Sequence, residues 1–480
     1  MKIELQKIAE RPLDISVVYI AQKDTDFSGY SFSTTELEFI RRQISNNKEA
    51  IHINSYFKWS YIYLITPKKN IYEQKENIRQ KGAELSSLIQ QNEHKEIVIE
   101  DVSGQPSLML AFIEGFILSQ YHFSNYKTNK KDTHFLKKIN VVSHGISSSD
   151  LNRLLNICKA VYHSRNLVNE PLSTLNATEL AKRIQSMGIE AGFSVETFNR
   201  KKIETLKLNG LLAVNKGSID PPTFSVLEWK PESATEQKPI VLVGKGVVYD
   251  TGGLSLKPSS FMTSMKSDMA GAATVAGILY LAASNNLPYH LIGLIPATDN
   301  RPDGNAYVPD DIITMHNGKT VEITNTDAEG RMIMADALSF SRQYNPELVF
   351  DFATLTGSAS RAIGPQGIVA MGTAEPNIMQ KLKESSYHTH ERIVELPLWE
   401  EYGEMIKSDV ADIKNAGGKE AGAITAGKFL ENFVDVPWIH LDIAPTAFLE
   451  RKDSYRGKGG TGIGVRLMND FLQNYKTNKS

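Results

Sequence analysis

The later two-thirds of the chain alternates short apolar runs with helical patterns, and this alternation constrains the fold more than any other feature. The apolar runs are rich in β-branched residues, which is typical of buried parallel strands. Five such runs span residues 239–244, 289–295, 347–352, 367–371 and 438–443. Helical patterns span residues 271–283, 331–343 and 423–433. Alternating elements need crossover connections, so the sequence predicts an α/β fold with a mostly parallel central sheet covered by helices.

The length of the chain predicts two domains, because 480 residues exceed what one hydrophobic core usually holds. Residues 1–145 mix helices and strands and contain no acids at metal-ligand spacing, so we expect a smaller α/β domain with a structural or assembly role. Residues 146–165 read as a linking helix. Residues 166–480 carry the alternating pattern and form the larger predicted domain.

Composition describes an ordinary globular protein, with 41% hydrophobic residues, 22% charged residues and a net charge of -2. This balance does not call for nucleic acid or an anionic membrane as a partner. The first residues lack an apolar core of signal-peptide length, and no run approaches 18 apolar residues. Cys158 is the only cysteine, which excludes an internal disulfide and argues against a thiolate metal site. We therefore expect a cytoplasmic protein.

Residues 325–331, Asn-Thr-Asp-Ala-Glu-Gly-Arg, form the most informative short motif. Asp327 and Glu329 lie two residues apart, and Arg331 follows just inside an apolar run that reads as a helix. Acids beside a base at a helix entrance suit a site for divalent cations and an oxyanion. Taken alone, the motif fits a capped helix start with a surface ion pair equally well.

A second polar cluster, within residues 243–272, follows the predicted strand at 239–244. Polar residues directly after a parallel strand lie at the carboxyl edge of the sheet, where open α/β folds bind their ligands. The two clusters together offer four acids and three nitrogen groups: Asp250, Asp268, Asp327 and Glu329 with Lys245, Lys257 and Arg331. Because no histidine or cysteine takes part, the set is rich in oxygen and suits zinc, manganese or magnesium rather than a zinc finger.

Three other patterns are weaker than they look. Residues 244–246 suggest a dinucleotide-binding turn, but Tyr249 stands where the third glycine should be. Residues 422–428 have the spacing of a phosphate-binding loop, but Phe429 replaces the required Ser or Thr, so we expect a helix start in the core. His440 lies in a predicted core strand, where a hydrogen-bonded structural histidine is the default.

The two polar clusters resemble those of the leucyl aminopeptidase (cytosol aminopeptidase) family. Residues 325–331 match the family's diagnostic heptapeptide at every position. Further blocks agree in order and approximate spacing, at residues 244–250, 252–253, 257–258, 265–273 and 353–357. The resemblance covers residues 160–470 and is faint before them. It implies that residues 166–480 form a catalytic domain that hydrolyses the N-terminal residue from peptides.

The resemblance also implies two divalent metal ions per subunit, zinc or manganese, with magnesium or cobalt as alternatives. Lys245, Asp250, Asp268 and Glu329 would hold one ion. Asp250, Asp327 and Glu329 would hold the other, so that Asp250 and Glu329 bridge the pair. An ammonium has no lone pair, so a ligating Lys245 must be neutral, as burial beside a dication favours.

Further roles carried over by position concern catalysis, specificity and assembly. Lys257 would polarise the scissile carbonyl, and Arg331 would hold a bicarbonate that acts as general base. The side-chain pocket would be lined by four residues compatible with leucine or other apolar side chains: Met265, Thr354, Gly357 and Ala444. The family resemblance implies a homohexamer.

Two other functions remain open from the sequence. A two-metal phosphoesterase would also use an oxygen-rich site with lysine and arginine. An additional nucleic-acid-binding role is disfavoured by the near-neutral charge, although a local basic patch could support one.

Overall fold

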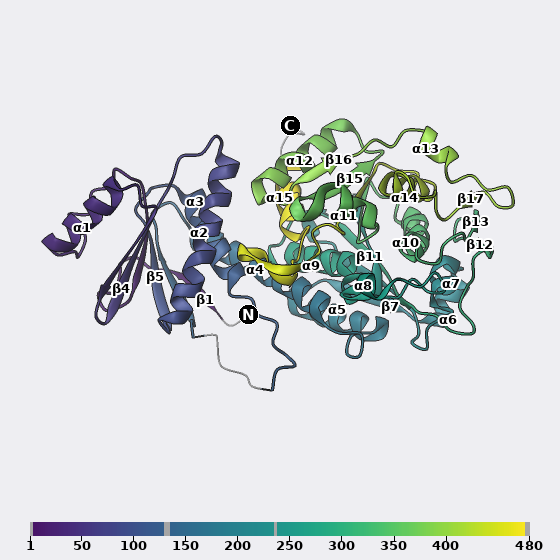
Figure 1. Cartoon of the computed structure of the whole chain (residues 1–480), viewed down its shortest axis with the longest axis horizontal. Coiled ribbons are helices and arrows are strands. Elements are labelled where there is room, and N and C mark those ends of the chain that lie inside the picture. Colours follow the sequence, from purple (N-terminus) through teal and green to yellow (C-terminus); the bar gives the residue numbers. More distant parts are fainter. Residues whose placement is uncertain (1–2, 129–134, 235–237, 476–480) are drawn as a thin grey trace. The chain divides into compact units, whose positions relative to one another are not determined.

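The protein is described here by a computed structural model that covers residues 3–128, 135–234 and 238–475. It divides into two compact units. The first comprises Met1–Lys159 together with Asp453–Gly457, and the second comprises Ala160–Lys452 and Lys458–Ser480. The division falls within the long helix α4 (Ser148–Asn169), which contains the buried Cys158 (Figure 1).

The first unit contains a six-stranded sheet in the order β1-β6-β5-β2-β4-β3. Its strands are β1 (Glu4–Lys7), β2 (Val17–Ala21), β3 (Ala50–Ser55), β4 (Lys58–Leu64), β5 (Glu96–Asp101) and β6 (Lys138–Val142). All neighbours are parallel except β3 and β4. Its helices are α1 (Thr34–Ser45), α2 (Ile71–Gln91) and α3 (Pro106–Ser119).

The second unit contains a nine-stranded sheet in the order β16-β15-β18-β14-β9-β11-β8-β7, with β10 paired to β11. Its strands are β7 (Ser194–Phe198), β8 (Thr223–Trp229), β9 (Ile240–Gly244), β10 (Gly246–Asp250), β11 (Leu291–Asn300), β14 (Leu348–Ala353), β15 (Ile368–Gly372), β16 (Ile393–Glu395) and β18 (Trp438–Asp442). The central neighbours β18, β14, β9 and β11 are all parallel. Antiparallel pairs occur only towards the flanks. The predicted mostly parallel sheet is confirmed.

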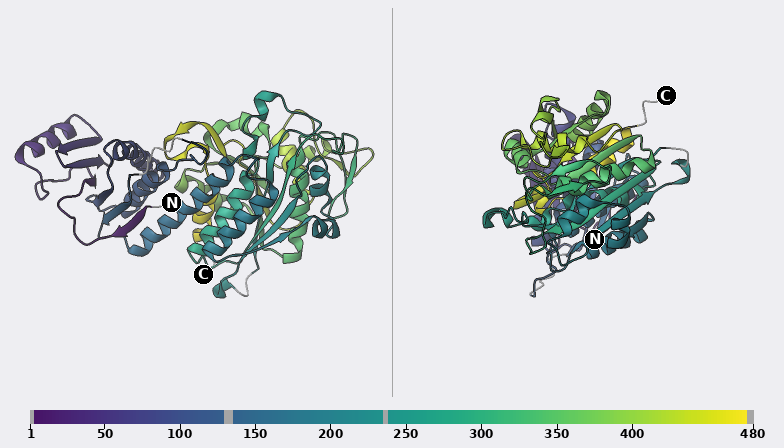
Figure 2. Two further views of the ribbon diagram at one scale, coloured as in Figure 1. Left: turned by 90° about the horizontal axis from the view of Figure 1, so that it is seen from below. Right: turned by 90° about the vertical axis from the view of Figure 1, so that its right-hand side faces the viewer.

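Helices cover both faces of this sheet. Successive residues of a strand point to opposite sides, so the strands place apolar side chains on both faces. Val241 and Val243 of β9 pack in one cluster with helix α10 (Glu329–Phe340). On the other face, a Cβ at Gly293 of β11 would lie 2.9 Å from Val275 of helix α9 (Ala270–Ser284). The strands and the helices around them can be followed in Figure 2.

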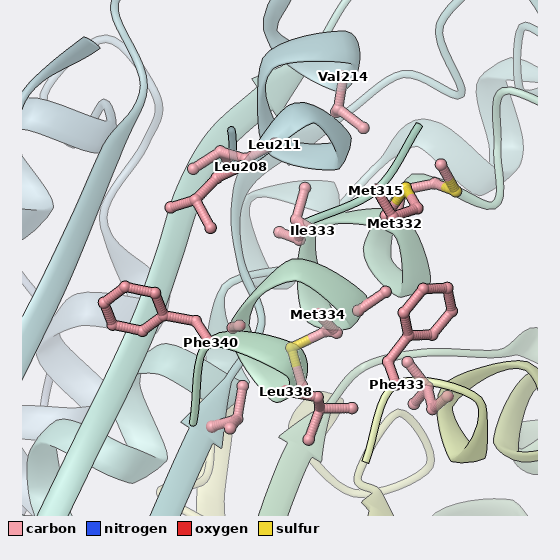
Figure 3. Packing of buried hydrophobic residues seen from close by; sticks show 14 of the residues in the cluster. Leu208, Leu211, Val214, Met315, Met332, Ile333, Met334, Leu338, Phe340 and Phe433 are labelled. Atoms are coloured by element: carbon pink, nitrogen blue, oxygen red, sulfur yellow. The ribbon is translucent and has the colours of Figure 1, made fainter. Parts of the chain in front are cut away.

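Helix α10 is buried at every one of its 12 positions. Figure 3 shows the packing, with labelled side chains from α10 and its surroundings: Leu208, Leu211, Val214, Met315, Met332, Ile333, Met334, Leu338, Phe340 and Phe433. Its first residue, Glu329, belongs to the candidate site, so the core of the unit fixes the position of that end of the helix.

The remaining elements lie mostly around the second sheet. The helices are α5 (Ala177–Ala191), α6 (Arg200–Thr205), α7 (Asn209–Asn215), α8 (Ser259–Met262), α11 (Gly357–Ile363), α12 (Pro376–Thr389), α13 (Glu401–Glu404), α14 (Gly422–Glu431) and α15 (Val465–Tyr475). Short strands are β12 (Ile312–Thr314), β13 (Thr320–Glu322), β17 (Ile413–Lys414), β19 (Phe448–Asp453) and β20 (Gly457–Gly460). Across the described ranges, none of the helices combines the length and apolarity needed to cross a membrane.

Candidate metal centre

The predicted acids converge at the carboxyl edge of the second sheet. Asp250 ends β10, and Asp268 lies two residues before the start of α9. Glu329 is the first residue of α10, and Asp327 lies two residues earlier in the loop. All four line one cavity of ≈ 550 Å³, a volume that suits a small ligand.

Three of these acids are close enough to share a cation. Asp250, Asp327 and Glu329 each offer one carboxylate oxygen, and these oxygens lie within 4.8 Å of one another. Asp250 is 2% exposed and Glu329 is 1% exposed. Burying several like charges together is costly unless cations compensate them. The site is therefore built to hold positive charge.

Two lysines supply that charge in this structure. Lys245 Nζ donates to Asp268 Oδ1 at 2.7 Å and lies 2.9 Å from Glu329 Oε1. Lys257 Nζ lies 2.8 Å from Asp250 Oδ2 and also contacts Asp327. Burial opposes charging, but the surrounding carboxylates raise the pKa of both lysines above the ordinary value. Both are ammonium groups here, and a neutral Lys245 would require a dication to replace these ion pairs.

The ion pairs leave part of the acid cluster unsatisfied. Asp268 Oδ2 and Glu329 Oε2 are buried, and neither has a hydrogen-bond partner among the described residues. Buried carboxylate oxygens without partners are rare and point to a ligand. Carboxylate oxygens with one amine nitrogen are suitable donors for a hard or borderline divalent cation. The residues present fit a pair of such ions.

The pKa values of the acids show how strongly the cluster favours cations or protons. Burial, reinforced by the charge of Glu329, raises the pKa of Asp250 to about 7 against the opposing effect of the two lysines. Burial also raises the pKa of Asp268 and of Asp327. Glu329 differs, because Lys245 and Lys257 outweigh burial and lower its pKa. Cations therefore compete with protons for these carboxylates.

Arg331 lines the same cavity from the first turn of α10. Its Nη1 donates to Asn415 O at 2.8 Å, while its buried Nε has no partner in the described part of the chain. Burial lowers the pKa of Arg331 to about 10, with Glu329 and Asp442 opposing. A planar guanidinium with a donor to spare suits a small planar anion.

The glycine of the heptapeptide has a spatial role. A Cβ at Gly330 would lie 2.4 Å from Lys245 Cε and 2.7 Å from its Nζ. Gly330 therefore leaves the space through which Lys245 reaches Glu329.

Sequence reasoning missed the polar residues that hold the two loops in place. Asn300 Nδ2 donates to Asp250 Oδ1 at 2.9 Å and to Thr326 O at 3.0 Å. Asn415 Nδ2 donates to Asn325 O at 2.7 Å, and its Oδ1 accepts from Thr324 N at 2.8 Å. Asn300 ends β11, so the edge-of-sheet argument that found Lys245 would also find it. Asn415 lies 90 residues from Asn325, and no local pattern indicates it.

The four predicted pocket residues, Met265, Thr354, Gly357 and Ala444, all line the cavity. Thr354 Oγ1 donates to Asp268 Oδ1 at 2.7 Å, which joins the pocket wall to the acid cluster. Asp442, to which the sequence assigned no role, links two segments of the pocket wall through hydrogen bonds. Its Oδ1 accepts from Leu355 N and Ala444 N, both at 3.1 Å.

Two predictions of structural roles are confirmed. His440 is fully buried, and its Nδ1 lies 2.6 Å from Asp351 Oδ1. Helix α14 begins at Gly422, and Phe429 is buried in the core.

The comparisons with known proteins place this architecture in a class of metal-dependent peptidases. Residues 162–469 match the catalytic domain of the cytosol aminopeptidase family. A probable cytosol aminopeptidase of Chloroherpeton thalassium is 43% identical over 383 residues, which span 76% of this chain and 75% of the relative. One from Geobacter sulfurreducens is 44% identical over 383 residues, 78% of this chain and 77% of the relative. The chain belongs to the cytosol aminopeptidase family and is a metal-dependent aminopeptidase.

Solved structures agree over nearly the whole chain. The bottromycin maturation enzyme BotP in complex with Mn has a TM-score of 0.84 at 29% identity, over 96% of this chain and 99% of that one. A mutant of tomato leucine aminopeptidase has a TM-score of 0.86 at 24% identity, over 98% and 97% of the two chains, and shows the shared fold.

Proposed function

We propose that this aminopeptidase is a dinuclear enzyme that removes leucine and other apolar residues from the N-termini of peptides. The observation that carries the proposal is the convergence of Asp250, Asp327 and Glu329 within 4.8 Å, in a cavity whose wall also includes apolar groups. Lys245, Asp250, Asp268 and Glu329 would hold one cation. Asp250, Asp327 and Glu329 would hold the other.

A bound pair of divalent cations supplies Lewis acidity and a water activated for attack near neutral pH. Zinc and manganese are the cations we propose, and the Mn in the BotP structure supports manganese. Asp268 is the acid best placed to accept from the α-ammonium of the substrate, because its Oδ2 is buried without a partner among the described residues. A site that needs a free α-amino group accepts only chain ends.

Lys257 and Arg331 take the remaining catalytic roles. The ammonium of Lys257 would donate to the oxygen of the scissile carbonyl as negative charge develops there, an effect worth about 3–4 kcal/mol for a well-placed donor. Arg331 has a buried Nε with no partner in the described ranges, and we assign it the binding of bicarbonate as the general base. The planar guanidinium matches the planar anion.

The preference for apolar residues follows from the pocket. Met265 and Ala444 contribute apolar groups, and Gly357 adds no side chain to the pocket wall. We further propose that residues 1–145 have a structural or assembly role, that 146–165 form a linking helix, and that the enzyme is a cytoplasmic homohexamer. The resemblance to the family supports these assignments.

Asp327→Asn tests the proposal, with leucine anilide as substrate and metal content measured on the same samples. Turnover should fall by at least about 10³-fold, equivalent to about 4 kcal/mol, while the circular dichroism spectrum stays unchanged. Chelator should remove the activity of the parent protein, and added bicarbonate should raise it. Asp409→Asn, at an exposed position, is the matched control.

Unchanged turnover in Asp327→Asn would refute the assignment. Hydrolysis of a phosphate ester without cleavage of the anilide would instead support a two-metal phosphoesterase.

A further inference from the structure

A cationic side chain lies on the wall of the cavity and takes no part in the acid cluster. Arg361 belongs to helix α11, which begins at Gly357, a residue of the pocket wall. In a helix, a long side chain points back over the residue four positions earlier. That residue is Gly357, which has no side chain, and Arg361 Nη1 lies 3.1 Å from where its Cβ would be.

The guanidinium is held facing the cavity. Its Nη2 donates to Ser358 Oγ at 3.0 Å. Gly357, Ser358 and Arg361 all line the cavity that contains Asp268 and Glu329. Both Gly357 and Arg361 are exposed, so this part of the wall is open to solvent and to a substrate.

Arg361 also differs from the other cations of the cavity in its partners. Lys245 and Lys257 each pair with two carboxylates. Within residues 3–128, 135–234 and 238–475, no carboxylate lies within ion-pair distance of Arg361. A guanidinium in this position can bind a carboxylate from outside the chain through two parallel N–H donors.

The chain path from the acid cluster to helix α11 is short enough for one small peptide to contact both. Thr354 donates to Asp268, and Gly357 lies three residues further along the chain, a span of at most about 10 Å. An extended dipeptide spans about 7 Å. Because this span is an upper limit and Arg361 lines the same cavity as Asp268, a substrate bound by its amino end at the acids can bring either its free C-terminus or an acidic side chain to Arg361.

We infer that Arg361 is a specificity-determining residue that binds a carboxylate of the substrate. This inference rests on the proposed aminopeptidase function. The carboxylate is either the free C-terminus of a dipeptide or the side chain of an aspartate or glutamate. Substrates with this carboxylate are preferred over isosteric neutral ones.

The test compares matched substrates in the parent enzyme and in Arg361→Gln. One arm measures kcat/KM for Leu-Leu and for its C-terminal amide, and the other arm for the anilides of glutamate and glutamine. In at least one arm, the ratio of the charged to the neutral substrate should fall by about 5- to 10-fold in Arg361→Gln, mainly through KM. The ratio cancels any general effect of the substitution on turnover.

Salt and two further variants sharpen the test. The preference of the parent should weaken between 0.05 and 0.5 M NaCl, because Arg361 is exposed. Arg361→Lys should keep part of it, since the charge remains and the paired donors are lost. Arg342→Gln, which removes an exposed arginine paired with Asp435, should leave both ratios unchanged.

Unchanged ratios in both arms of Arg361→Gln would overturn the inference. If the parent cleaves leucine anilide in that case, the proposed function stands and only the role of Arg361 fails. If the parent cleaves neither dipeptide nor anilide, the proposed function itself fails.

Discussion

The two units of this chain both bury charged side chains, but they compensate those charges differently. In the first unit, Arg79 of α2 donates through Nε to Glu114 of α3 at 2.6 Å. Glu76 lies 3.6 Å from Arg79, and Tyr455 donates to Glu76 Oε2 at 2.8 Å. The acids here pair with a guanidinium and accept a hydrogen bond from a hydroxyl of the same unit.

In the second unit the compensation is incomplete. Four carboxylates share the ammonium groups of Lys245 and Lys257, and buried oxygens of Asp268 and Glu329 have no partner among the described residues. Buried acids whose oxygens have partners contribute to the fold, whereas buried acids with unpartnered oxygens that face a cavity provide binding capacity. The contrast distinguishes buried charged residues that stabilise the fold from buried charged residues that form the candidate metal centre.

The largest expected effect comes from neutralising an acid of the incomplete cluster. Glu329→Gln should lower turnover of leucine anilide by about 10⁴-fold, equivalent to about 5 kcal/mol, and lower the bound metal. After chelator treatment, the variant should unfold at no lower temperature than the parent. The amide still accepts from Lys245, and its NH₂ can donate to the neighbouring carboxylates. Calorimetry on chelated samples, with the exposed Glu401→Gln as control, measures this.

Breaking the buried network of the first unit should have the opposite outcome. Arg79→Met leaves Glu114 buried without its guanidinium, and should cost the first unit about 3–5 kcal/mol of unfolding free energy. Metal content per folded molecule should stay the same. Denaturant unfolding measures the loss, and Arg41→Met at an exposed position of α1 should change stability by less than about 0.5 kcal/mol. Equal stability of Arg79→Met and the parent would contradict the comparison.

Another buried acid, Asp336, lies in the second unit outside the metal site. Its oxygens accept from Leu211 N and His316 N, both at 3.0 Å. Burial nevertheless outweighs these backbone donors and raises its pKa to about 7. In the unfolded chain the pKa is about 3.9. Between these pH values only the folded chain keeps the proton. The contribution of Asp336 to the unfolding free energy is therefore largest below pH 4 and is lost as pH rises through 7.

Asp336→Asn should therefore show the smallest effect, and one that depends on pH. The unfolding free energy of the parent minus that of the variant should fall from pH 5 to pH 8, by at most about 1.4 kcal/mol per pH unit. Thermal unfolding at several pH values measures this difference, and the exposed Asp303→Asn serves as control. A difference that stays constant from pH 5 to pH 8 would show that Asp336 is already ionised in the folded protein at pH 5.

Features encoded by neighbouring residues could be predicted from the sequence. The apolar runs predicted β9, β11, β14, β15 and β18, because β-branched runs of this length become buried strands. The acids of the heptapeptide and those after β9 could also be predicted, because their spacing and their position after a strand indicate a shared site.

Contacts between distant segments could not be predicted in the same way. Asn415 donates a hydrogen bond to the loop before α10 from 90 residues away, and no local sequence pattern predicts such a contact. Tyr455 binds Glu76 across 379 residues, and brings the segment Asp453–Gly457 into the first unit. The antiparallel strands β7 and β8 extend the sheet beyond the predicted parallel part.

The complete burial of α10 has a consequence for heat inactivation. Glu329 is the first residue of a helix with no exposed position, so its end cannot fray without disturbing the core around Met332 and Leu338. Local unfolding of this helix would disable catalysis, but it would also expose the core, so it costs nearly as much free energy as unfolding the unit. Loss of activity on heating and loss of the native fold should be a single event.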